Sequence, residues 1–266
     1  MGSGLLQGKR GVVMGVANER SIAWACAQAC AAEGASLVFS YPGEALEKRV
    51  RKLAGDMEGA AVFQCDVRED DSITNFFAQV KEHCGTIDFV IHSIAYAERS
   101  DLMGRFVDTQ RANFLLALDV SAYSLVAVSR EAEALMPDGG SILAMTFYGG
   151  EKVMPRYNVM GVAKAALDMC MRYLVVDLGP KKIRVNCLSP GPVKTLSASA
   201  ITGFRNMFDI ADSVSPLRRI ATPEEIAQSA VFMVSDRSAS ISGEILHIDA
   251  GYHVLGMFAV DPRVGE

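Results

Sequence analysis

The sequence predicts an α/β fold, a single Rossmann-type domain with a doubly wound sheet of about seven parallel strands flanked by helices. Short β-branched apolar runs alternate with longer segments of helical period, which is typical of a parallel sheet covered on both faces. No Pro-, Gly- or Ser-rich linker and no internal repeat divides the 266 residues, a length that doubly wound folds often reach as one unit. We therefore expect residues 1–266 to form one domain.

The elements follow in order along the chain. Residues 10–14 predict a buried strand because RGVVM is a short apolar run, and residues 21–33 predict a helix with small side chains on one face. Residues 44–53 predict a charged amphipathic helix. The same signals predict further strands at residues 36–40, 61–65, 88–92, 141–146, 184–189 and 244–249. They predict further helices at residues 71–83, 113–135, 157–178 and 223–234. Right-handed crossovers then place a ligand crevice beyond the carboxyl ends of the strands.

The composition excludes several classes of protein. Half of the residues are hydrophobic and 21% are charged, which suits a large buried core rather than disorder. The apolar runs have the length of strands rather than the ~20 residues of a membrane helix, and residues 1–8 lack the apolar region of a signal peptide. The net charge of −5 argues against nucleic acid as the main partner. We expect a cytoplasmic protein that binds neither membrane nor nucleic acid.

The cysteines and histidines do not indicate a metal site. Six cysteines are dispersed through apolar segments without a C-x-x-C pair, and the four histidines lack the spacing of zinc ligands. Reduced core cysteines are favoured over disulfides, and no bound metal is expected.

Residues 15–23 join the first predicted strand to its helix, where a dinucleotide-binding fold receives the pyrophosphate. Gly15 can form the tight turn, Ala17 allows close approach, and Ser21 can cap the helix or donate to a phosphate. Gly15, Ser21 and Ile22 are therefore candidate cofactor-binding residues. The usual G-x-G-x-x-G pattern is absent, and an ordinary turn and cap explain these residues equally well.

The adenosine half of such a cofactor is expected beside the ends of the second and third strands. Asp66 can accept a hydrogen bond from the adenine amino group while Val67 packs on the ring, the alternative being an ordinary strand-end acid and a core valine. The second strand ends in Ser40-Tyr41-Pro42, without an acid for a ribose 2′-hydroxyl or an arginine for a 2′-phosphate. The missing cation favours NADH over NADPH.

Residues 148–164 carry the candidate chemistry, because two tyrosines and a lysine follow a strand that should end at the crevice. Tyr157 and Lys164 are seven residues apart, so on a helix they lie on one face. A nearby ammonium favours ionisation of a tyrosine and also makes its neutral hydroxyl a better hydrogen-bond donor. Such pairs also occur by chance on ordinary helices.

The order of several motifs resembles that of the bacterial enoyl-acyl-carrier-protein reductases, a divergent branch of the short-chain dehydrogenase/reductases. Tyr157 and Lys164 match their Tyr-x6-Lys signature, whereas other members of the superfamily carry Tyr-x3-Lys and this chain has Gly161 at that point. The accompanying motifs are Gly15-x5-Ser21-Ile22-Ala23, Cys65-Asp66-Val67, His92-Ser93-Ile94-Ala95, Tyr157-Asn158-Val159-Met160-Gly161, Arg184-Val185-Asn186, Gly191-Pro192-Val193-Lys194-Thr195-Leu196 and Ile241-Ser242-Gly243-Glu244. The resemblance covers residues 8–256. Tyr148 departs from it, since it stands nine residues before Tyr157 where the family has ten.

This resemblance implies reduction of the trans-2 double bond of enoyl-acyl-carrier-protein thioesters by hydride transfer from NADH, in fatty-acid elongation. It implies that Tyr157 stabilises an enolate, that Lys164 binds the nicotinamide ribose, and that Tyr148 lines the pocket or assists proton delivery. Further cofactor contacts that it implies are Ser93, Ile94, Val193 and Thr195. Further substrate contacts that it implies are Ala97, Met160, Phe204 and Met207.

Residues 195–216 are expected to form a substrate-binding loop or helix that closes over the acyl chain, although the pattern alone fits an ordinary surface helix equally well. Four cations near this segment are candidates to meet an acidic acyl carrier protein, the commoner alternative being a solvated surface: Lys194, Arg205, Arg218 and Arg219. The resemblance also implies a homotetramer, with the apolar residues 241–258 as a contact surface.

Two rival functions follow from the same fold. A ketone or alcohol reductase is disfavoured by the absence of Tyr-x3-Lys. A non-catalytic regulator that senses NADH has no reason to keep both Tyr157 and Lys164 at the crevice.

Overall fold

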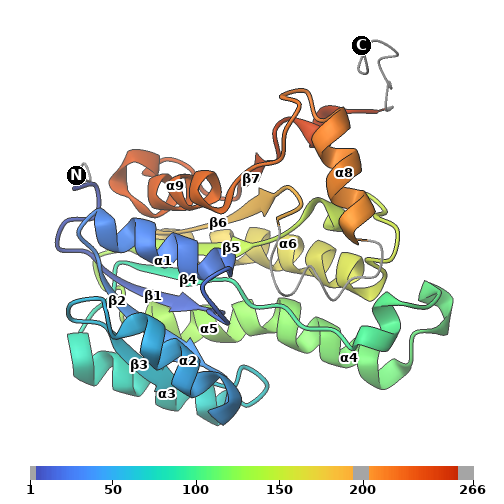
Figure 1. Cartoon of the computed structure of the whole chain (residues 1–266). Helices are drawn as coiled ribbons and strands as arrows, with labels where there is room; N and C mark the ends of the chain where they lie inside the picture. The colour runs from blue at the N-terminus through green and yellow to red at the C-terminus, as the bar shows by residue number, and fades with distance from the viewer. Residues whose placement is uncertain (1–3, 194–203, 257–266) are drawn as a thin grey trace.

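The computed structural model describes residues 4–193 and 204–256. One parallel sheet forms its centre, with the strands in the order β3-β2-β1-β4-β5-β6-β7 (Figure 1). The strands are β1 (Arg10–Met14), β2 (Ser36–Tyr41), β3 (Ala61–Gln64), β4 (Phe89–His92), β5 (Gly140–Met145), β6 (Ile183–Pro190) and β7 (Ile245–Ile248). Every predicted strand is confirmed, and its ends differ from the predicted ends by one residue at most. This order is that of a doubly wound dinucleotide-binding fold, so the predicted fold class is confirmed.

Helices cover both faces of this sheet (Figure 1). One face carries α1 (Ile22–Ala32), α2 (Glu44–Ala54) and α9 (Pro223–Val234). The other face carries α3 (Asp70–Cys84), α5 (Ser124–Glu133) and α6 (Val159–Leu178). α4 (Arg111–Leu118) precedes α5, and α8 (Phe204–Val214) lies on the side where the strands end (Figure 1).

The period of two along each strand divides its side chains between two cores. In β5, Ile142 and Ala144 pack under α3, α5 and α6, whereas Leu143 and Met145 pack under α1, α2 and α9. All four side chains are buried. A strand covered on both faces requires apolar residues at consecutive positions, which explains why apolar runs rather than alternating patterns predict the strands.

The strand order reverses between β1 and β4. Met14 and His92 are the last paired positions of these neighbours. The chain leaves β1 towards β2 on one side, whereas it leaves β4 towards β5 on the other. Diverging connections open a crevice at the carboxyl ends of the two strands, which is where open α/β sheets bind ligands.

The helix predicted at residues 113–135 is a composite of α4, a π-helical turn at Asp119–Tyr123 and α5. The π-helical turn directs Ser121 at the loop after β4. Its hydroxyl accepts a hydrogen bond from the Tyr96 amide at 2.9 Å and donates to the Tyr96 carbonyl oxygen at 3.1 Å. The run Arg111–Glu133 is long and apolar enough to cross a membrane, but half of its most apolar window is buried inside the fold, as in a core helix.

Candidate active site

The turn after β1 requires glycine. Gly15 has a φ of +97°, and a Cβ at this residue would lie 2.0 Å from the carbonyl oxygen of Ser93. The missing side chain lets the end of β1 lie against the loop that follows β4, at the point where the strand order reverses. The positive φ and this close approach agree with the conformation predicted for Gly15, and its contact with a cofactor stays a prediction.

The chain then enters α1 through Ser21, which is the N-cap residue by position. Its hydroxyl makes no capping bond and instead donates to the Asn18 carbonyl oxygen at 2.7 Å. Of the two roles that the sequence allows for Ser21, the side-chain cap is not formed, because a nearer carbonyl in the preceding turn takes the hydroxyl, and donation to a phosphate stays a prediction. Ile22 begins the helix. The Trp24 amide donates to the Ser21 carbonyl oxygen at 3.0 Å, so the Ile22 and Ala23 amides are the ones that remain to attract an anion to this helix end.

Asp66 follows β3 as predicted, but its carboxylate is already engaged. The Nε of Arg68 donates to both carboxylate oxygens, at 3.0 and 3.1 Å, and the Arg68 amide donates to Oδ1 at 3.1 Å. The guanidinium lowers the pKa of the Asp66 carboxyl. Val67 is buried beside it. An adenine amino group bound here would have to share Asp66 with Arg68.

A cation also reaches the end of β2, where the linear sequence shows none. Arg51 projects from α2 over the ring of Tyr41, with the guanidinium carbon 5.6 Å from the ring centroid. Its Nε donates to Glu47 at 2.8 Å. The carboxylate of Glu47 therefore balances the charge that Arg51 brings to this corner.

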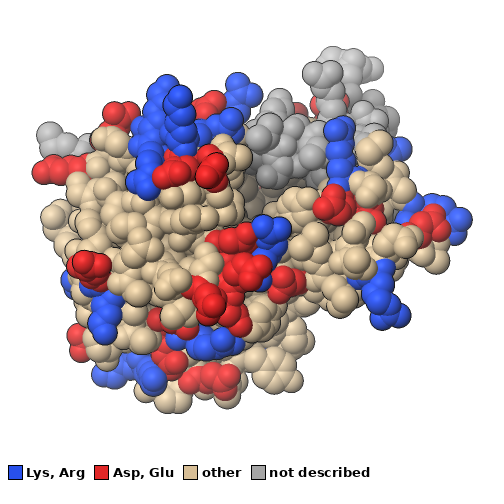
Figure 2. All heavy atoms as spheres, turned by 90° about the horizontal axis from the view of Figure 1, so that it is seen from below, with Lys and Arg blue, Asp and Glu red and all other residues tan. Residues whose placement is uncertain are grey.

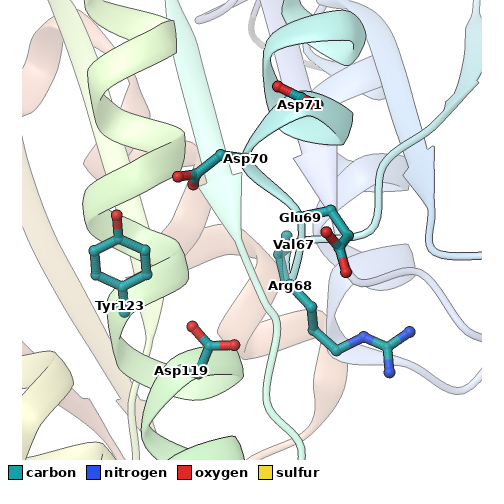
Figure 3. A pocket seen from close by; sticks show the side chains of 7 residues that line it. All are labelled: Val67, Arg68, Glu69, Asp70, Asp71, Asp119 and Tyr123. Carbon is teal, nitrogen blue, oxygen red and sulfur yellow. The ribbon is translucent and has the colours of Figure 1, made fainter.

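An acidic cavity of about 420 Å³ opens beside this adenosine end (Figure 3). Its lining residues are Val67, Arg68, Glu69, Asp70, Asp71, Asp119 and Tyr123. Asp70 and Asp71 begin α3, and Asp119 lies opposite them on the π-helical turn (Figure 3). Partial burial and then Asp70 raise the pKa of Asp119. Figure 2 shows a group of Asp and Glu side chains near the middle of the face seen from below, which also carries Lys and Arg side chains. The carboxylates that line the cavity disfavour phosphate groups there and leave the α1 end as the better anion site.

A turn of small residues connects the predicted catalytic groups. A single 3-10 turn, Tyr148–Gly150, follows β5. A Cβ at Gly149 would lie 2.5 Å from the ring of Tyr157, and a Cβ at Gly150 would lie 3.0 Å from the backbone of Lys164. Because these positions lack side chains, one turn of chain contacts both Tyr157 and Lys164.

Tyr157 does not lie on the helix where the sequence placed it. α6 begins at Val159, and the residues on either side of Tyr157 are left-handed, with φ of 65° at Arg156 and 44° at Asn158. The Nδ2 of Asn158 donates to the Asp101 carbonyl oxygen at 2.7 Å, which fixes the turn. The expectation that Tyr157 and Lys164 share a helix face was wrong, because left-handed residues delay the start of the helix.

The Tyr157 side chain is 9% exposed, and its ring packs edge-on against Phe147 with centroids 4.9 Å apart. Burial, followed by the charge of Asp168, raises the pKa of the Tyr157 hydroxyl above its usual value. Of the two possibilities that the sequence left open, ionisation is therefore disfavoured. Tyr157 presents a neutral hydroxyl donor.

Lys164 lies on α6 and is 5% exposed. Its Nζ donates to the Met145 carbonyl oxygen, the last of β5, at 2.6 Å. Burial lowers the pKa of Lys164 to about 8, opposed by Cys187 and Asp168. The ammonium form therefore predominates at neutral pH, with two N–H donors left for a ligand.

Tyr148 is held by the C-terminal part of the described chain. Its hydroxyl donates to the His253 carbonyl oxygen at 3.2 Å. Its ring lies edge-on to His247 and Tyr252, with centroid distances of 6.2 and 6.0 Å. These contacts fix the position of the Tyr148 ring and leave its hydroxyl engaged.

The remaining predicted residues lie at neighbouring strand ends. Ser93 and Ile94 follow β4, and the buried Val193 follows β6. Met160 forms a small apolar cluster with Tyr157 and Leu102, against which Ala97 packs. Thr195, Lys194 and the side chains of Phe204, Arg205 and Met207 lie outside the described residues.

The sequence interpretation missed two polar groups beside Lys164. Asp168 stands four residues further along α6, a spacing that puts it on the same helix face. His92 ends β4, and its Nε2 lies 2.9 Å from the Ser124 Oγ. Ser124 donates its hydrogen to the Val120 carbonyl oxygen, so His92 is the donor in that contact. Burial, then Lys164, lowers the pKa of His92 to about 3, so its imidazole is neutral.

A family model described as enoyl-(acyl carrier protein) reductase matches residues 15–253. The chain is 50% identical over 259 residues to the enoyl-[acyl-carrier-protein] reductase [NADH] 1 of Rhizobium meliloti (strain 1021), and the alignment covers 97% of this chain and 95% of that protein.

Two solved structures are also similar. One is an enoyl-(acyl-carrier-protein) reductase of Anaplasma phagocytophilum in complex with NAD, with a TM-score of 0.94 and 44% identity over 98% of this chain and 99% of that chain. The other is the Bacillus cereus enoyl-acyl carrier protein reductase with NADP+ and indole naphthyridinone, with a TM-score of 0.94 and 50% identity over 97% of this chain and all of that chain.

Proposed function

The chain belongs to the enoyl-(acyl carrier protein) reductase family, and we propose that it is an NADH-dependent enoyl-acyl-carrier-protein reductase of fatty-acid elongation. It reduces the trans-2 carbon–carbon double bond of the enoyl thioester. The observation that carries this proposal is the buried, neutral hydroxyl of Tyr157, packed against the same turn that contacts Lys164.

The residues around the crevice fit a nicotinamide dinucleotide. Gly15 keeps the first turn close to the sheet, and the start of α1 offers free amides to a pyrophosphate. Lys164 has two N–H donors for ribose hydroxyls after its bond to Met145. When bound, the dinucleotide supplies the hydride. Ser93, Ile94, Val193 and Thr195 are proposed to contact it, and Asp66 and Val67 to hold the adenine.

The choice of NADH over NADPH rests on the charge balance at β2. Arg51 is the cation over Tyr41, and Glu47 pairs with it. A ribose 2′-phosphate would meet the Glu47 carboxylate along with the guanidinium, whereas a 2′-hydroxyl carries no charge to repel. The name of the Rhizobium relative specifies NADH, while the Bacillus structure contains NADP+. We propose a lower KM for NADH than for NADPH.

The reaction requires a donor where negative charge develops. As the β-carbon of the substrate accepts the hydride, charge moves onto the thioester oxygen, and Tyr157 donates a hydrogen bond to that oxygen. A preorganised donor in a buried site acts more strongly than one in water, because the local dielectric is low. The α-carbon then takes a proton that comes from solvent water, so the double bond becomes a single bond with one new hydrogen on each carbon. Lys164 orients the ribose and adds a positive field.

The acyl chain is proposed to lie along the cluster formed by Tyr157, Met160 and Ala97. Tyr148 is proposed as a wall of this pocket rather than a proton donor, because its hydroxyl is engaged by His253.

Residues 195–216 are proposed to close over the acyl chain, with Phe204 and Met207 as further contacts. Support comes from α8, which lies on the side of the sheet where the strands end (Figure 1). Its described part buries Phe208 and Ala211. Hydrogen exchange tests this proposal: cofactor plus an enoyl analogue should slow exchange in this segment, and unchanged exchange contradicts it.

The acyl carrier protein is proposed to dock beside this segment. Arg218 is the better described candidate, because Arg219 is paired with Glu225 at 2.7 Å. Lys194 and Arg205 remain candidates from the sequence. Arg218→Glu should raise the KM for the carrier-linked substrate more than the KM for a short thioester. Equal changes contradict a docking role.

A cytoplasmic homotetramer with a single domain over residues 1–266 is proposed as the working form. Exposed apolar side chains follow one another along α6, namely Met169, Tyr173 and Val176, and give this helix a face suited to a subunit contact. Residues 241–258, which contain the edge strand β7, are a second candidate contact. Sedimentation of the purified chain tests the tetramer, and a monomer at micromolar concentration contradicts it.

The reaction class is tested by comparing two thioesters. NADH oxidation should be rapid with a crotonyl thioester and negligible with an acetoacetyl thioester. The opposite preference would indicate a ketone reductase, and NADH binding without turnover of either would indicate a regulator.

A further inference from the structure

Asp168 is a buried carboxyl group to which the mechanism above assigns no part. It lies on α6 four residues after Lys164, so the two side chains leave the helix on the same face. Asp168 is 5% exposed. Its Oδ1 has no hydrogen-bond partner among the described residues. A carboxyl group buried in this way costs free energy, which calls for a compensating function.

The turn after β5 makes room for this carboxyl. A Cβ at Gly150 would lie 3.1 Å from the Asp168 Oδ2 and 2.9 Å from the Ala165 amide nitrogen. A side chain at residue 150 would therefore push the turn away from α6 or displace the carboxyl. Gly150 therefore allows the turn to contact Lys164 and also leaves room for the Asp168 carboxyl group.

Charged and titratable groups from each packed element face Asp168. Lys164 and Arg172 of α6 favour its ionised form, whereas Glu151 of the turn opposes it. Burial is the largest influence, and it raises the pKa of the Asp168 carboxyl. Cys187 on β6 also faces Asp168. Burial raises the pKa of the Cys187 thiol, and the negative charge of Asp168 raises it further.

Two further groups complete these surroundings. The Thr146 hydroxyl at the end of β5 is buried and, as a nearby hydrogen-bond donor, lowers the pKa of the Asp168 carboxyl. The hydroxyl of Tyr157 is the other group, and its ionisation is opposed by the Asp168 charge. A single carboxylate thus favours the charged form of Lys164 and the neutral form of Tyr157.

We propose that Asp168 is a positioning residue whose carboxylate keeps the buried Lys164 as an ammonium. The proposal rests on the proposed function, in which Lys164 binds the ribose of NADH as a cation. Asp168 acts through Lys164 and touches neither substrate nor cofactor. The negative charge of Asp168 matters because Lys164 is buried, and burial by itself favours the neutral amine over the ammonium.

The test is the pH dependence of NADH binding, measured by calorimetry without any enoyl substrate. In the unmodified protein, the Kd should rise as pH increases through about 8, the pKa of Lys164. Asp168→Asn removes the charge at nearly constant volume, and it should move this midpoint to lower pH. Asp168→Glu should retain most of the original midpoint. An unchanged midpoint in Asp168→Asn overturns the proposal.

Asp177→Asn is the matched control, because Asp177 is an exposed acid on the same helix, and its midpoint should not move. A general loosening of α6 would weaken NADH binding equally at every pH and would also overturn the proposal. If Asp168→Asn does not fold, Asp168→Ser is measured in the same way. The experiment measures NADH binding and needs no turnover. The shift can therefore be interpreted even if the chain does not reduce enoyl thioesters.

Discussion

The Lys164 ammonium donates a hydrogen bond to the Met145 carbonyl oxygen across 2.6 Å, which ties α6 to the last residue of β5. This bond sets the position of the buried cation at the edge of the sheet. It uses one of three N–H donors and leaves two for a ribose. The carbonyl partner is neutral, so the charge remains available to a ligand.

Replacing Lys164 tests its role in cofactor binding. Lys164→Met keeps an unbranched apolar stem but removes the charge, and the Kd for NADH should rise about tenfold or more, because hydrogen bonds to charged groups contribute about 1.5–3 kcal/mol. Lys181→Met is the control, since Lys181 is an exposed lysine paired with Glu133. Equal NADH affinity in the Lys164 variant and the unmodified protein contradicts the ribose role.

Turnover should fall on the alkaline side. Burial places the pKa of Lys164 at about 8, so the ammonium is present below that pH and is lost as pH rises through it. The profile of kcat/KM for NADH should therefore decline with a midpoint near pH 8. Tyr157 adds no second alkaline decline in this range, since burial raises the pKa of its hydroxyl. A profile that stays flat up to pH 10 would contradict this account.

The turn at Gly15 is tested by adding a single methyl group. Gly15→Ala should destabilise the fold by more than the about 1 kcal/mol that a left-handed alanine costs by itself, because the new Cβ would meet the Ser93 carbonyl oxygen. Gly59→Ala separates the two effects, since Gly59 also has a positive φ, +71°, but has no heavy atom within 4 Å of such a Cβ. Urea unfolding measures both. Similar losses in the two variants would show that the contact with Ser93 is unimportant.

His92 should make stability depend on pH. Its pKa is about 3 in the folded protein and about 6.5 when unfolded, so between these values the unfolded chain binds the extra proton. The free energy of unfolding should therefore fall as pH decreases below about 6.5, by about 1.4 kcal/mol per unit from this group. His92→Gln can still donate to Ser124 and should show a shallower fall. Parallel pH dependence in the two proteins would contradict the burial of a neutral imidazole.

The sheet and its helices were predictable because each buried strand is a short apolar run and each helix has its own period. The arrangement of the candidate active site could be predicted only in part. Nothing in the local pattern indicates that Arg156 and Asn158 are left-handed, which removes Tyr157 from the helix. The sequence assigned Asp66 to an adenine. Only the structure shows that the side chain of Arg68, two residues further along the chain, forms an ion pair with it.

Asp168 was missed for a different reason. An acid four residues after a lysine is the usual pattern of an exposed helix pair, so its burial becomes visible only once α6 is packed on the sheet. Arg51 likewise lies ten residues after Tyr41 in the chain and reaches its ring through the fold of α2.

The central claim is that the Tyr157 hydroxyl stabilises the charge formed on an enoyl thioester. Tyr157→Phe should lower kcat for NADH oxidation with a crotonyl thioester by about 100- to 1000-fold, the usual effect of losing one donor to a developing oxyanion, while the Kd for NADH stays within about twofold. Tyr173→Phe, at a tyrosine on α6 that is 71% exposed, should leave kcat unchanged. Unchanged turnover in Tyr157→Phe would contradict the account.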